Sequence, residues 1–207
     1  MRRVVALVRP VPSVFELGCA VETFGTPRRY AFETCTEEPG PAPTNGGYAM
    51  AVSQGLAALD SADSVIVPGW LPVEEPLSDP VREALLRAHA RGTRLVTICS
   101  GVFALARTGL LDGRSATTHW GRAEQLRREF SQVRVEPDRL YAAHGDVATS
   151  TGAGLDLCFR VLDAGQAGDM AWRRARVQLV ELDTGHTVHE TDPEGFAGAV
   201  GAFLAGL

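Results

Sequence analysis

The residues with the clearest chemical potential are Cys99, Ser100 and Gly101, which stand where a short apolar run ends. Residues 95–98 are expected to form a buried strand, and residues 102–106 are expected to start an apolar helix. A cysteine at such a turn is lifted out of the sheet, and the helix amides favour its thiolate. Small residues after it, Gly101 included, let a substrate approach the backbone. The sequence therefore predicts a nucleophile elbow; the alternative is a buried structural cysteine.

A nucleophilic thiol needs a partner that takes up and returns its proton. Glu16 is the first candidate, because it lies early in a short helix after the first strand, where apolar neighbours are expected to raise its pKa. Its alternative is an ordinary glutamate in a first helical turn, and Glu22, further into the helix, competes with it. His119 follows a short strand end at 116–119 and is the second candidate, with a structural hydrogen-bonding role as its alternative.

Binding of a developing negative charge requires N–H donors near the sulfur. The amides of Gly69 and Ser100 are the expected donors, because a glycine at the end of a buried strand leaves room for a substrate. Trp70, Phe103 and Trp120 stand near the same positions in the sequence. They indicate an apolar or aromatic ligand if they face the site, and otherwise they belong to the core.

Composition excludes several other classes of protein. A chain of 207 residues with 45% hydrophobic and 22% charged residues is expected to form one soluble domain, with at most a small appendage. The net charge of −5, with arginines interleaved among glutamates at 122–129, gives no basic surface for nucleic acid. No apolar run is long enough to cross a membrane. Four scattered cysteines without a CxxC pair predict a reducing cytoplasm, and neither disulfides, a metal nor a cofactor.

Strands are expected to alternate with helices along the chain. The expected strands are 4–8, 30–35, 65–67, 95–98, 133–135, 140–143 and 147–150. The expected helices are 15–24, 79–90 with Asp79 as N-cap, 120–130, and one that begins at 155–162. A Pro- and Gly-rich loop at 38–47 and a hairpin arm at 48–52 are also expected. The alternation predicts an α/β fold, a parallel sheet with helices on both faces that binds ligands beyond the carboxyl ends of its strands.

Four segments of this chain resemble the ThiJ/PfpI superfamily, which has the class I glutamine-amidotransferase-like fold. They are Val-Pro-Gly-Trp at 67–70, the elbow run at 97–106, the run at 108–120 that ends in Thr-Thr-His-Trp, and Gly-Asp-Val-Ala-Thr-Ser at 145–150. The resemblance covers about residues 3–163. It is strongest with the branch that forms the sensor domain of AraC-type regulators and that includes isonitrile hydratase. It implies a flavodoxin-like three-layer sandwich with a mostly parallel sheet and a nucleophile elbow, usually as a homodimer.

The resemblance also assigns site residues. It places the elbow cysteine at Cys99, its acidic partner at Glu16, the oxyanion glycine at Gly69 and the neighbouring histidine at His119. In isonitrile hydratase the residue after the cysteine takes part, and here that residue is Ser100. The proteases of the superfamily have a histidine at this position, so a peptidase is not expected. The segment 150–158 is shorter than the family's usual run, so the pocket or the dimer surface is expected to differ there.

The sequence divides at about residue 165 into a ThiJ/PfpI domain at 1–165 and an appended tail at 166–207. The tail reads as a strand at 177–182 and a helix at 193–204, and resembles the carboxyl end of α/β-hydrolases, in which a histidine such as His186 is the triad base. The sequence contains no Gly-x-Ser-x-Gly elbow, which would supply the serine of such a triad. The tail is therefore expected to add a strand and a helix to the same domain. The alternative is that His186 or His189 serves as the base for Cys99.

Two classes of function follow. In the first, the protein is a small-molecule enzyme resembling isonitrile hydratase. The Cys99 thiolate attacks an electrophilic carbon, Glu16 acts as acid and base, and Ser100 orients the substrate. A glyoxalase-like or deglycase reaction on an α-oxoaldehyde would use the same pair together with His119. In the second class, the chain is a ligand- or redox-sensing domain derived from an AraC-type regulator. Because no paired helix-turn-helix motifs follow, DNA binding of the usual kind is not expected.

Overall fold

The structure is a computed structural model that describes residues 1–25, 30–152 and 158. The chain divides into two units, residues 1–160 and 161–207, and the described residues belong to the first. The expected boundary at residue 165, the tail with His186 and His189, and the helix expected from 155, apart from Cys158, lie outside the described residues.

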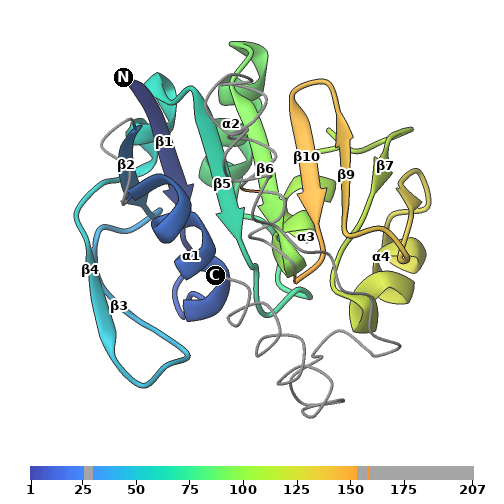
Figure 1. The fold of residues 1–207 in the computed structure, drawn as a ribbon, viewed down its shortest axis with the longest axis horizontal. Helices are drawn as coiled ribbons and strands as arrows, with labels where there is room; N and C mark the ends of the chain where they lie inside the picture. Colours follow the sequence, from blue (N-terminus) through green and yellow to red (C-terminus); the bar gives the residue numbers. More distant parts are fainter. Residues whose placement is uncertain (26–29, 153–157, 159–207) are drawn as a thin grey trace, which may run out of the picture. The chain divides into compact units, whose positions relative to one another are not determined.

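A six-stranded sheet forms the centre of the first unit (Figure 1). In spatial order its strands are β2 (Tyr30–Cys35), β1 (Arg2–Leu7), β5 (Ser64–Pro68), β6 (Arg94–Ile98), β10 (Val147–Ser150) and β9 (Tyr141–His144). All neighbours run parallel except β9, which is antiparallel to β10. β5 is buried along its whole length, as expected of an apolar strand that is covered on both faces. The prediction of a mostly parallel sheet is confirmed.

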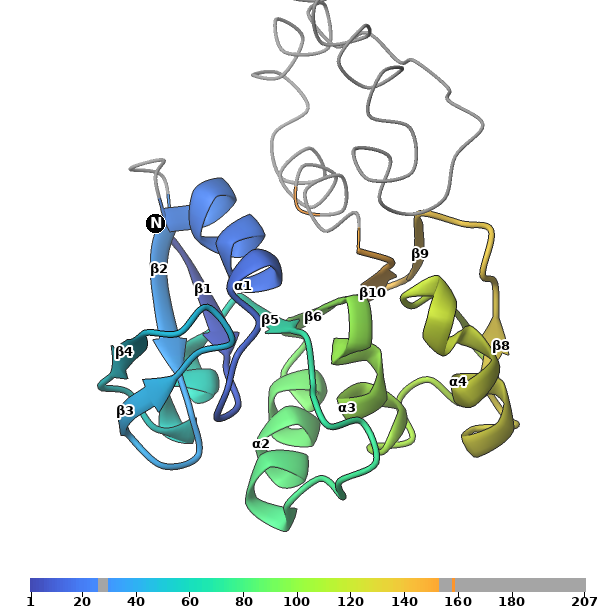
Figure 2. The same cartoon turned by 90° about the horizontal axis from the view of Figure 1, so that it is seen from below.

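Helices cover both faces of this sheet. They are α1 (Val14–Ala20), which continues as a π-helical turn at Val21–Gly25, α2 (Asp79–Ala90), α3 (Val102–Ala106) and α4 (Ala123–Glu129). Figure 2 shows α1 on one face and α2 with α3 on the other. Short 3-10 turns stand at Leu56–Ser61, Cys99–Gly101 and Trp120–Arg122. The arrangement is the α/β flavodoxin-like fold that the sequence predicted.

The start of α2 differs by one residue from the prediction. Ser78 is the N-cap, because its hydroxyl oxygen accepts a hydrogen bond from the Val81 N–H at 3.4 Å, and Asp79 is the first residue of the helix. The same hydroxyl donates to the Glu37 carboxylate at 2.8 Å. Serine and aspartate are equally good N-caps, so a Ser-Asp pair alone does not show which residue caps the helix.

The segment 38–47 is not entirely a loop. β3 (Gly40–Pro43) pairs antiparallel with β4 (Ala49–Val52), so the hairpin expected at 48–52 has its first strand inside the expected loop. Pro41 and Pro43 are two residues apart, and their missing N–H groups therefore lie on the same edge of the strand. The other edge remains able to pair. A second small parallel pair joins β7 (Ser115–Ala116) to β8 (Arg134–Val135).

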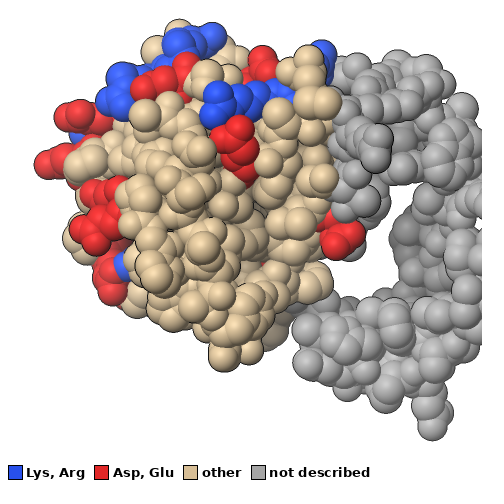
Figure 3. Space-filling model, turned by 90° about the vertical axis from the view of Figure 1, so that its left-hand side faces the viewer, with Lys and Arg blue, Asp and Glu red and all other residues tan. Residues whose placement is uncertain are grey.

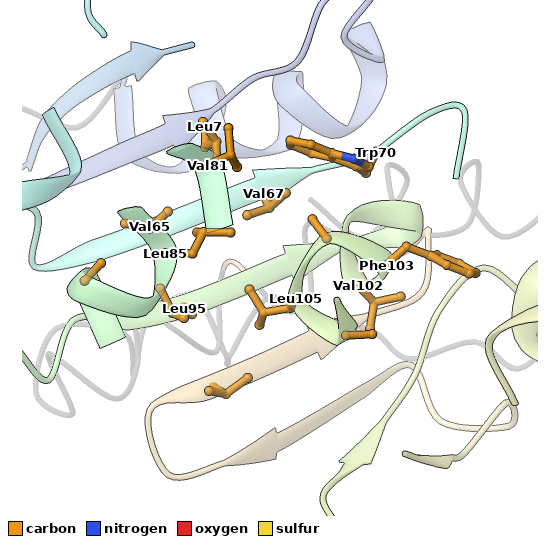
Figure 4. Packing of buried hydrophobic residues seen from close by; sticks show 14 of the residues in the cluster. Leu7, Val65, Val67, Trp70, Val81, Leu85, Leu95, Val102, Phe103 and Leu105 are labelled. Atoms are coloured by element: carbon orange, nitrogen blue, oxygen red, sulfur yellow. The ribbon is translucent and has the colours of Figure 1, made fainter. Parts of the chain in front are cut away.

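The core between the sheet and α2 and α3 positions the turn at Cys99. Figure 4 shows Val65, Val67 and Leu95 of the sheet beside Leu85 of α2 and the side chains of α3. All five residues of α3 are buried, with at most 4% of each exposed. A helix this short is not stable by itself, so burial on all sides is what holds it in place.

Surface charge agrees with the composition. On the face seen in Figure 3, arginine and acidic side chains lie close to one another, and a broad uncharged area lies beside them. That face presents no continuous basic surface of the kind that nucleic-acid binding requires. Within the described residues, no helix is long and apolar enough to cross a membrane.

Gly101 allows the turn after β6 to pack directly on β5. A Cβ atom at residue 101 would lie 3.1 Å from the Val67 carbonyl carbon, closer still to its oxygen, and 3.3 Å from the Gly69 nitrogen. These are backbone atoms at and just beyond the carboxyl end of β5, which cannot move aside as a flexible side chain can. The glycine therefore has a packing role, in addition to the substrate contact expected from the sequence.

We predict that Gly101→Ala lowers the free energy of unfolding by about 1–3 kcal/mol, because the added methyl group forces β5 and the turn apart. Urea denaturation followed by circular dichroism measures this change. Gly18→Ala in α1 is the matched control, since a Cβ there meets nothing within 4 Å, and it should stabilise the helix by about 0.5–1 kcal/mol. Equal stability of Gly101→Ala and wild type would contradict the packing role.

Candidate active site

Cys99 stands at the turn from β6 into α3 with a left-handed backbone conformation, at φ 55°. This conformation costs a residue other than glycine about 1–2 kcal/mol. Two hydrogen bonds hold it. The Cys99 N–H donates to the Thr151 carbonyl at 3.3 Å, and the Cys99 carbonyl accepts from the Thr118 hydroxyl at 2.9 Å. The predicted strand-to-helix turn is therefore present, and its side chain is 8% exposed.

Glu16 lies in α1, far from Cys99 in the sequence, but close to the Cys99 thiol in the structure. Its carboxylate is close enough to the thiol to raise the thiol pKa, and it accepts a hydrogen bond from the Ser13 hydroxyl just before the helix. The Glu16 side chain is half-buried, whereas the competing Glu22 is exposed. The structure thus brings together Cys99 and Glu16, as expected, and adds Ser13, which sequence reasoning missed.

Groups around the Cys99 thiol act on its pKa in opposite directions. Burial raises its pKa to about 12, and the negative charge and hydrogen bond of Glu16 act in the same direction. The Ser100 N–H, which bonds the sulfur, and the positive charge of Arg122 lower the pKa, but they do not outweigh burial. The helix amides that favour the thiolate are thus opposed by burial and by Glu16, and the thiolate expected from the sequence stays a prediction. The helix beyond the turn is short, and the amide that bonds the sulfur acts against both desolvation and a carboxylate.

Gly69 also differs from its expected role as an anion donor. Its N–H donates to the Ile98 carbonyl at 3.1 Å, so this amide is already paired with the neighbouring strand. Its positive φ of 64° explains why a glycine stands there. A Cβ at residue 69 would lie 3.7 Å from both the Ser100 hydroxyl and the Ser13 Cβ, so the bare side of Gly69 faces the site.

Ser100 is held by the neighbouring strand end. Its hydroxyl oxygen accepts a hydrogen bond from the Trp70 backbone N–H at 2.9 Å, and the side chain is 3% exposed. The hydroxyl proton is thereby directed away from the Trp70 amide, and is able to donate elsewhere. Trp70 itself is buried at the end of β5, beside the core residues labelled in Figure 4.

His119 lies on the segment that bonds the elbow. The Thr118 hydroxyl next to it contacts Cys99, while the His119 Nδ1 accepts from the Gly121 N–H at 3.1 Å. The imidazole thus caps the 3-10 turn at Trp120–Arg122, and it stacks on Trp120 with ring centroids 5.5 Å apart. Trp120 is 64% exposed and does not belong to the core, whereas Phe103 is fully buried.

A hollow of about 930 Å3 lies beside the elbow, and Ser13, Trp70 and Arg122 form part of its wall. Each of these residues also interacts with a group at the elbow. The Ser13 hydroxyl donates to the Glu16 carboxylate, and the Trp70 backbone N–H donates to the Ser100 hydroxyl. The positive charge of Arg122 lowers the pKa of the Cys99 thiol. In the sequence, Arg122 stands out only by its place among glutamates. Among the described residues, no group of three His, Cys, Asp or Glu side chains is placed to hold a metal ion.

The sequence is similar to those of several known proteins. GbdR, an HTH-type transcriptional regulator of Pseudomonas aeruginosa, is 31% identical over 121 residues, which make up 56% of this chain and 32% of the regulator. The chain thus spans about a third of that relative's length. Isonitrile hydratase of Pseudomonas putida is 39% identical over 59 residues, which make up 28% of this chain and 26% of the enzyme.

The fold has known counterparts as well. The crystal structure of a ThiJ/PfpI family protein from Pseudomonas syringae matches with a TM-score of 0.74 at 18% identity, covering 99% of this chain and 86% of that one. At this identity the likeness shows the fold alone. The model of the DJ-1/PfpI family matches residues 5–164, which is more than half of the chain. This protein therefore belongs to the DJ-1/PfpI family.

Proposed function

We propose that the protein is a small-molecule enzyme in which Cys99 is the nucleophile and Glu16 its acid–base partner. The observation that carries the proposal is the proximity of the Glu16 carboxylate, whose charge acts on the thiol pKa, to a cysteine held in a strained backbone conformation. Strain in a residue other than glycine persists where the surrounding structure enforces it, and such residues cluster at functional sites. A carboxylate within hydrogen-bond reach of a thiol is also the geometry that general base catalysis needs.

The first step starts from the neutral thiol. As the Cys99 sulfur bonds the terminal carbon of an isonitrile, Glu16 accepts the thiol proton and passes it to the same carbon. The product is a thioimidate, in which the sulfur is bonded to a carbon that carries one hydrogen and a double bond to nitrogen. Because the sulfur loses its proton only as it attacks, the raised pKa of Cys99 is compatible with catalysis.

In the second step, water hydrolyses the thioimidate. Glu16 takes a proton from the water as its oxygen adds to the thioimidate carbon, and the nitrogen gains a proton. The carbon–sulfur bond then breaks, the sulfur recovers its proton, and an N-substituted formamide leaves. The Ser100 hydroxyl is positioned to donate to the substrate nitrogen, because its oxygen is already held by the Trp70 amide. Arg122 supplies positive charge that stabilises the anionic sulfur during both steps.

The similarity to isonitrile hydratase supports this reaction, and Ser100 directly after the cysteine agrees with it. That similarity covers 28% of the chain, so an α-oxoaldehyde is a second substrate class for the same pair. In that reaction the sulfur would attack the aldehyde carbon, and His119 would serve as an additional proton carrier. Gly69, Gly101 and Trp120 would then border the substrate, as the sequence suggested.

Ligand sensing without turnover is the second candidate function. The relatives that include GbdR are transcriptional regulators, and the hollow beside the elbow offers space for a ligand. Redox sensing by oxidation of Cys99 belongs to the same candidate function. A ligand-binding domain would keep the fold and the hollow, yet would show no turnover.

We predict that Glu16→Gln accelerates alkylation of Cys99 by iodoacetamide at about pH 9. The carboxylate raises the pKa of the thiol, so its removal lowers that pKa and increases the thiolate fraction, by about tenfold for a shift of one unit. The rate is measured against pH for Cys99 by mass spectrometry. In the wild type the rate should keep rising toward strongly alkaline pH.

Glu22→Gln is the matched control, because Glu22 is an exposed carboxylate just beyond the same helix. It should leave the alkylation profile of Cys99 unchanged. A wild-type profile with a midpoint well below the ordinary thiol pKa, or one that Glu16→Gln does not alter, would contradict the proposed pair.

We further predict that Glu16→Gln lowers turnover of an alkyl isonitrile by about 10²–10⁴-fold, because it removes the acid–base group while the nucleophile remains. Cys99→Ser should abolish turnover, and Glu22→Gln should retain it. Loss of the isonitrile infrared band and appearance of the formamide proton in NMR follow the reaction. Methylglyoxal is tested in parallel. Absence of turnover with both compounds, in a protein whose alkylation behaves as predicted, would favour ligand sensing.

A further inference from the structure

The helix that carries Glu16 begins with the sequence of a capping box, but the structure uses its two polar residues differently. In a capping box, Ser-x-x-Glu, the serine hydroxyl accepts from the glutamate N–H, and the glutamate side chain accepts from the serine N–H. Ser13, the N-cap of α1, and Glu16 have this spacing. Neither of the two backbone hydrogen bonds forms between these described residues, and the Ser13 hydroxyl instead donates to the Glu16 carboxylate. The carboxylate is therefore held by a side chain and not by the start of the helix.

Asn45 caps the helix in place of the Ser13 side chain. It lies at the tip of the β3–β4 hairpin, 31 residues further along the chain than Val14. Its side-chain Oδ1 accepts a hydrogen bond at 2.9 Å from the Val14 N–H, which is the first N–H of α1. Its backbone N–H donates to the Pro12 carbonyl at 3.4 Å. Asn45 therefore holds the residues on both sides of Ser13.

The tip of the hairpin is fixed by its own hydrogen bonds and packs closely on α1. The backbone N–H and the hydroxyl of Thr44 both donate to the Tyr48 carbonyl at 2.8 Å, and the Gly46 N–H donates to the Thr44 hydroxyl at 3.2 Å. A Cβ at residue 46 would lie 3.0 Å from the Val14 Cγ2 atom, which is closer than ordinary van der Waals contact. A glycine at this position therefore lets a rigid turn bring Asn45 to the start of the helix.

The segment before α1 is held by contacts with other parts of the chain. Val11 has a left-handed backbone conformation at φ 60°, which is unfavourable for a β-branched residue. Such a conformation persists only where the surrounding structure enforces it. The Arg9 guanidinium donates to the Pro72 carbonyl at 3.1 Å on one side of Val11, and Asn45 bonds Pro12 on the other. Asn45 thus fixes the segment at the point where it enters the helix.

We propose that Asn45 is a positioning residue for Glu16, an inference that rests on the proposed acid–base pair. By holding the residues on both sides of Ser13, it keeps the serine hydroxyl on the Glu16 carboxylate. That carboxylate thereby stays near the Cys99 thiol. Without Asn45 the first turn of α1 loses its cap, and the capping box that Ser13 and Glu16 are able to form satisfies the freed helix N–H groups instead. The carboxylate then turns back to the Ser13 N–H and moves away from the thiol.

Alkylation of Cys99 by iodoacetamide reports the position of the Glu16 charge. At about pH 9, Asn45→Ala should accelerate it about 2- to 5-fold, because a carboxylate further from the sulfur raises the thiol pKa less. In the Glu16→Gln background, Asn45→Ala should change nothing further, since the charge that it positions is gone. An unchanged rate in Asn45→Ala alone would overturn the proposal. Equal acceleration in both backgrounds would also overturn it, because it would mean that the substitution only exposes the thiol.

Two further variants separate the side-chain cap from a general effect of the hairpin. Asn45→Asp keeps an acceptor oxygen for the Val14 N–H and should not accelerate alkylation. Gln54→Ala is the matched control, because Gln54 is an exposed amide just after β4 whose side chain forms no hydrogen bond within the described residues. Hydrogen exchange of the Val14 amide, measured by NMR on 15N-labelled protein, should be faster in Asn45→Ala and unchanged in the other two. Equal acceleration of alkylation by Asn45→Asp and Asn45→Ala would contradict the role of the acceptor.

Turnover of an alkyl isonitrile gives a second measurement. Asn45→Ala should lower kcat about 3- to 30-fold and leave KM unchanged, because it misplaces the acid–base group without altering substrate binding. The outcomes distinguish this role from the proposed function. If Glu16→Gln does not alter alkylation, the Cys99–Glu16 pair is wrong, and the role of Asn45 with it. If Glu16→Gln accelerates alkylation and Asn45→Ala does not, the pair stands and Asn45 does not position it. Absence of isonitrile turnover contradicts the enzyme, while alkylation still decides the role of Asn45.

Discussion

The close packing of residue 101 against β5 is the constraint on which the rest of the site depends. Because Gly101 has no side chain, the turn after β6 approaches the Val67 carbonyl within a distance that no Cβ would allow. That approach brings α3 back over the sheet, where all five of its residues are buried. Cys99 must then adopt a left-handed conformation to join the strand to the helix. The position of the sulfur is therefore a consequence of backbone packing two residues further along.

Burial of this sulfur decides what kind of chemistry it can do. In a cysteine that is 8% exposed and close to a carboxylate, burial and the carboxylate both raise the pKa of the thiol and oppose the favourable field of the helix amides. In the proposed reaction, Glu16 is the base that takes the thiol proton. The Ser13 hydroxyl fixes the carboxylate from the other side. The proposed reaction, in which the proton moves during attack, depends on this positioned pair.

Local patterns were sufficient to predict most of the fold. The strands at 30–35 and 147–150 have the predicted bounds, because turn residues flank each apolar run. The strand at 40–43 was missed, since its two prolines weigh against a strand unless both lie on the unpaired edge. Contacts between distant segments explain the other differences. That Gly69 donates to Ile98, and that Arg122 acts on Cys99, depends on which strands and turns become neighbours, which the residue types alone do not show.

Trp70 links the two parts of the site, and this link bears on why one fold serves both enzymes and regulators. Its backbone N–H fixes the Ser100 hydroxyl beside Cys99, whereas its side chain forms part of the wall of the hollow. A ligand bound in the hollow would therefore rest on the same residue that orients the elbow. In an enzyme this arrangement would hold a substrate next to the sulfur. In a sensing domain it would allow occupancy of the hollow to be transmitted to the turn without any covalent step. The geometry of Trp70 serves either use, and the acid–base contact between Glu16 and Cys99 is the feature that favours the enzyme.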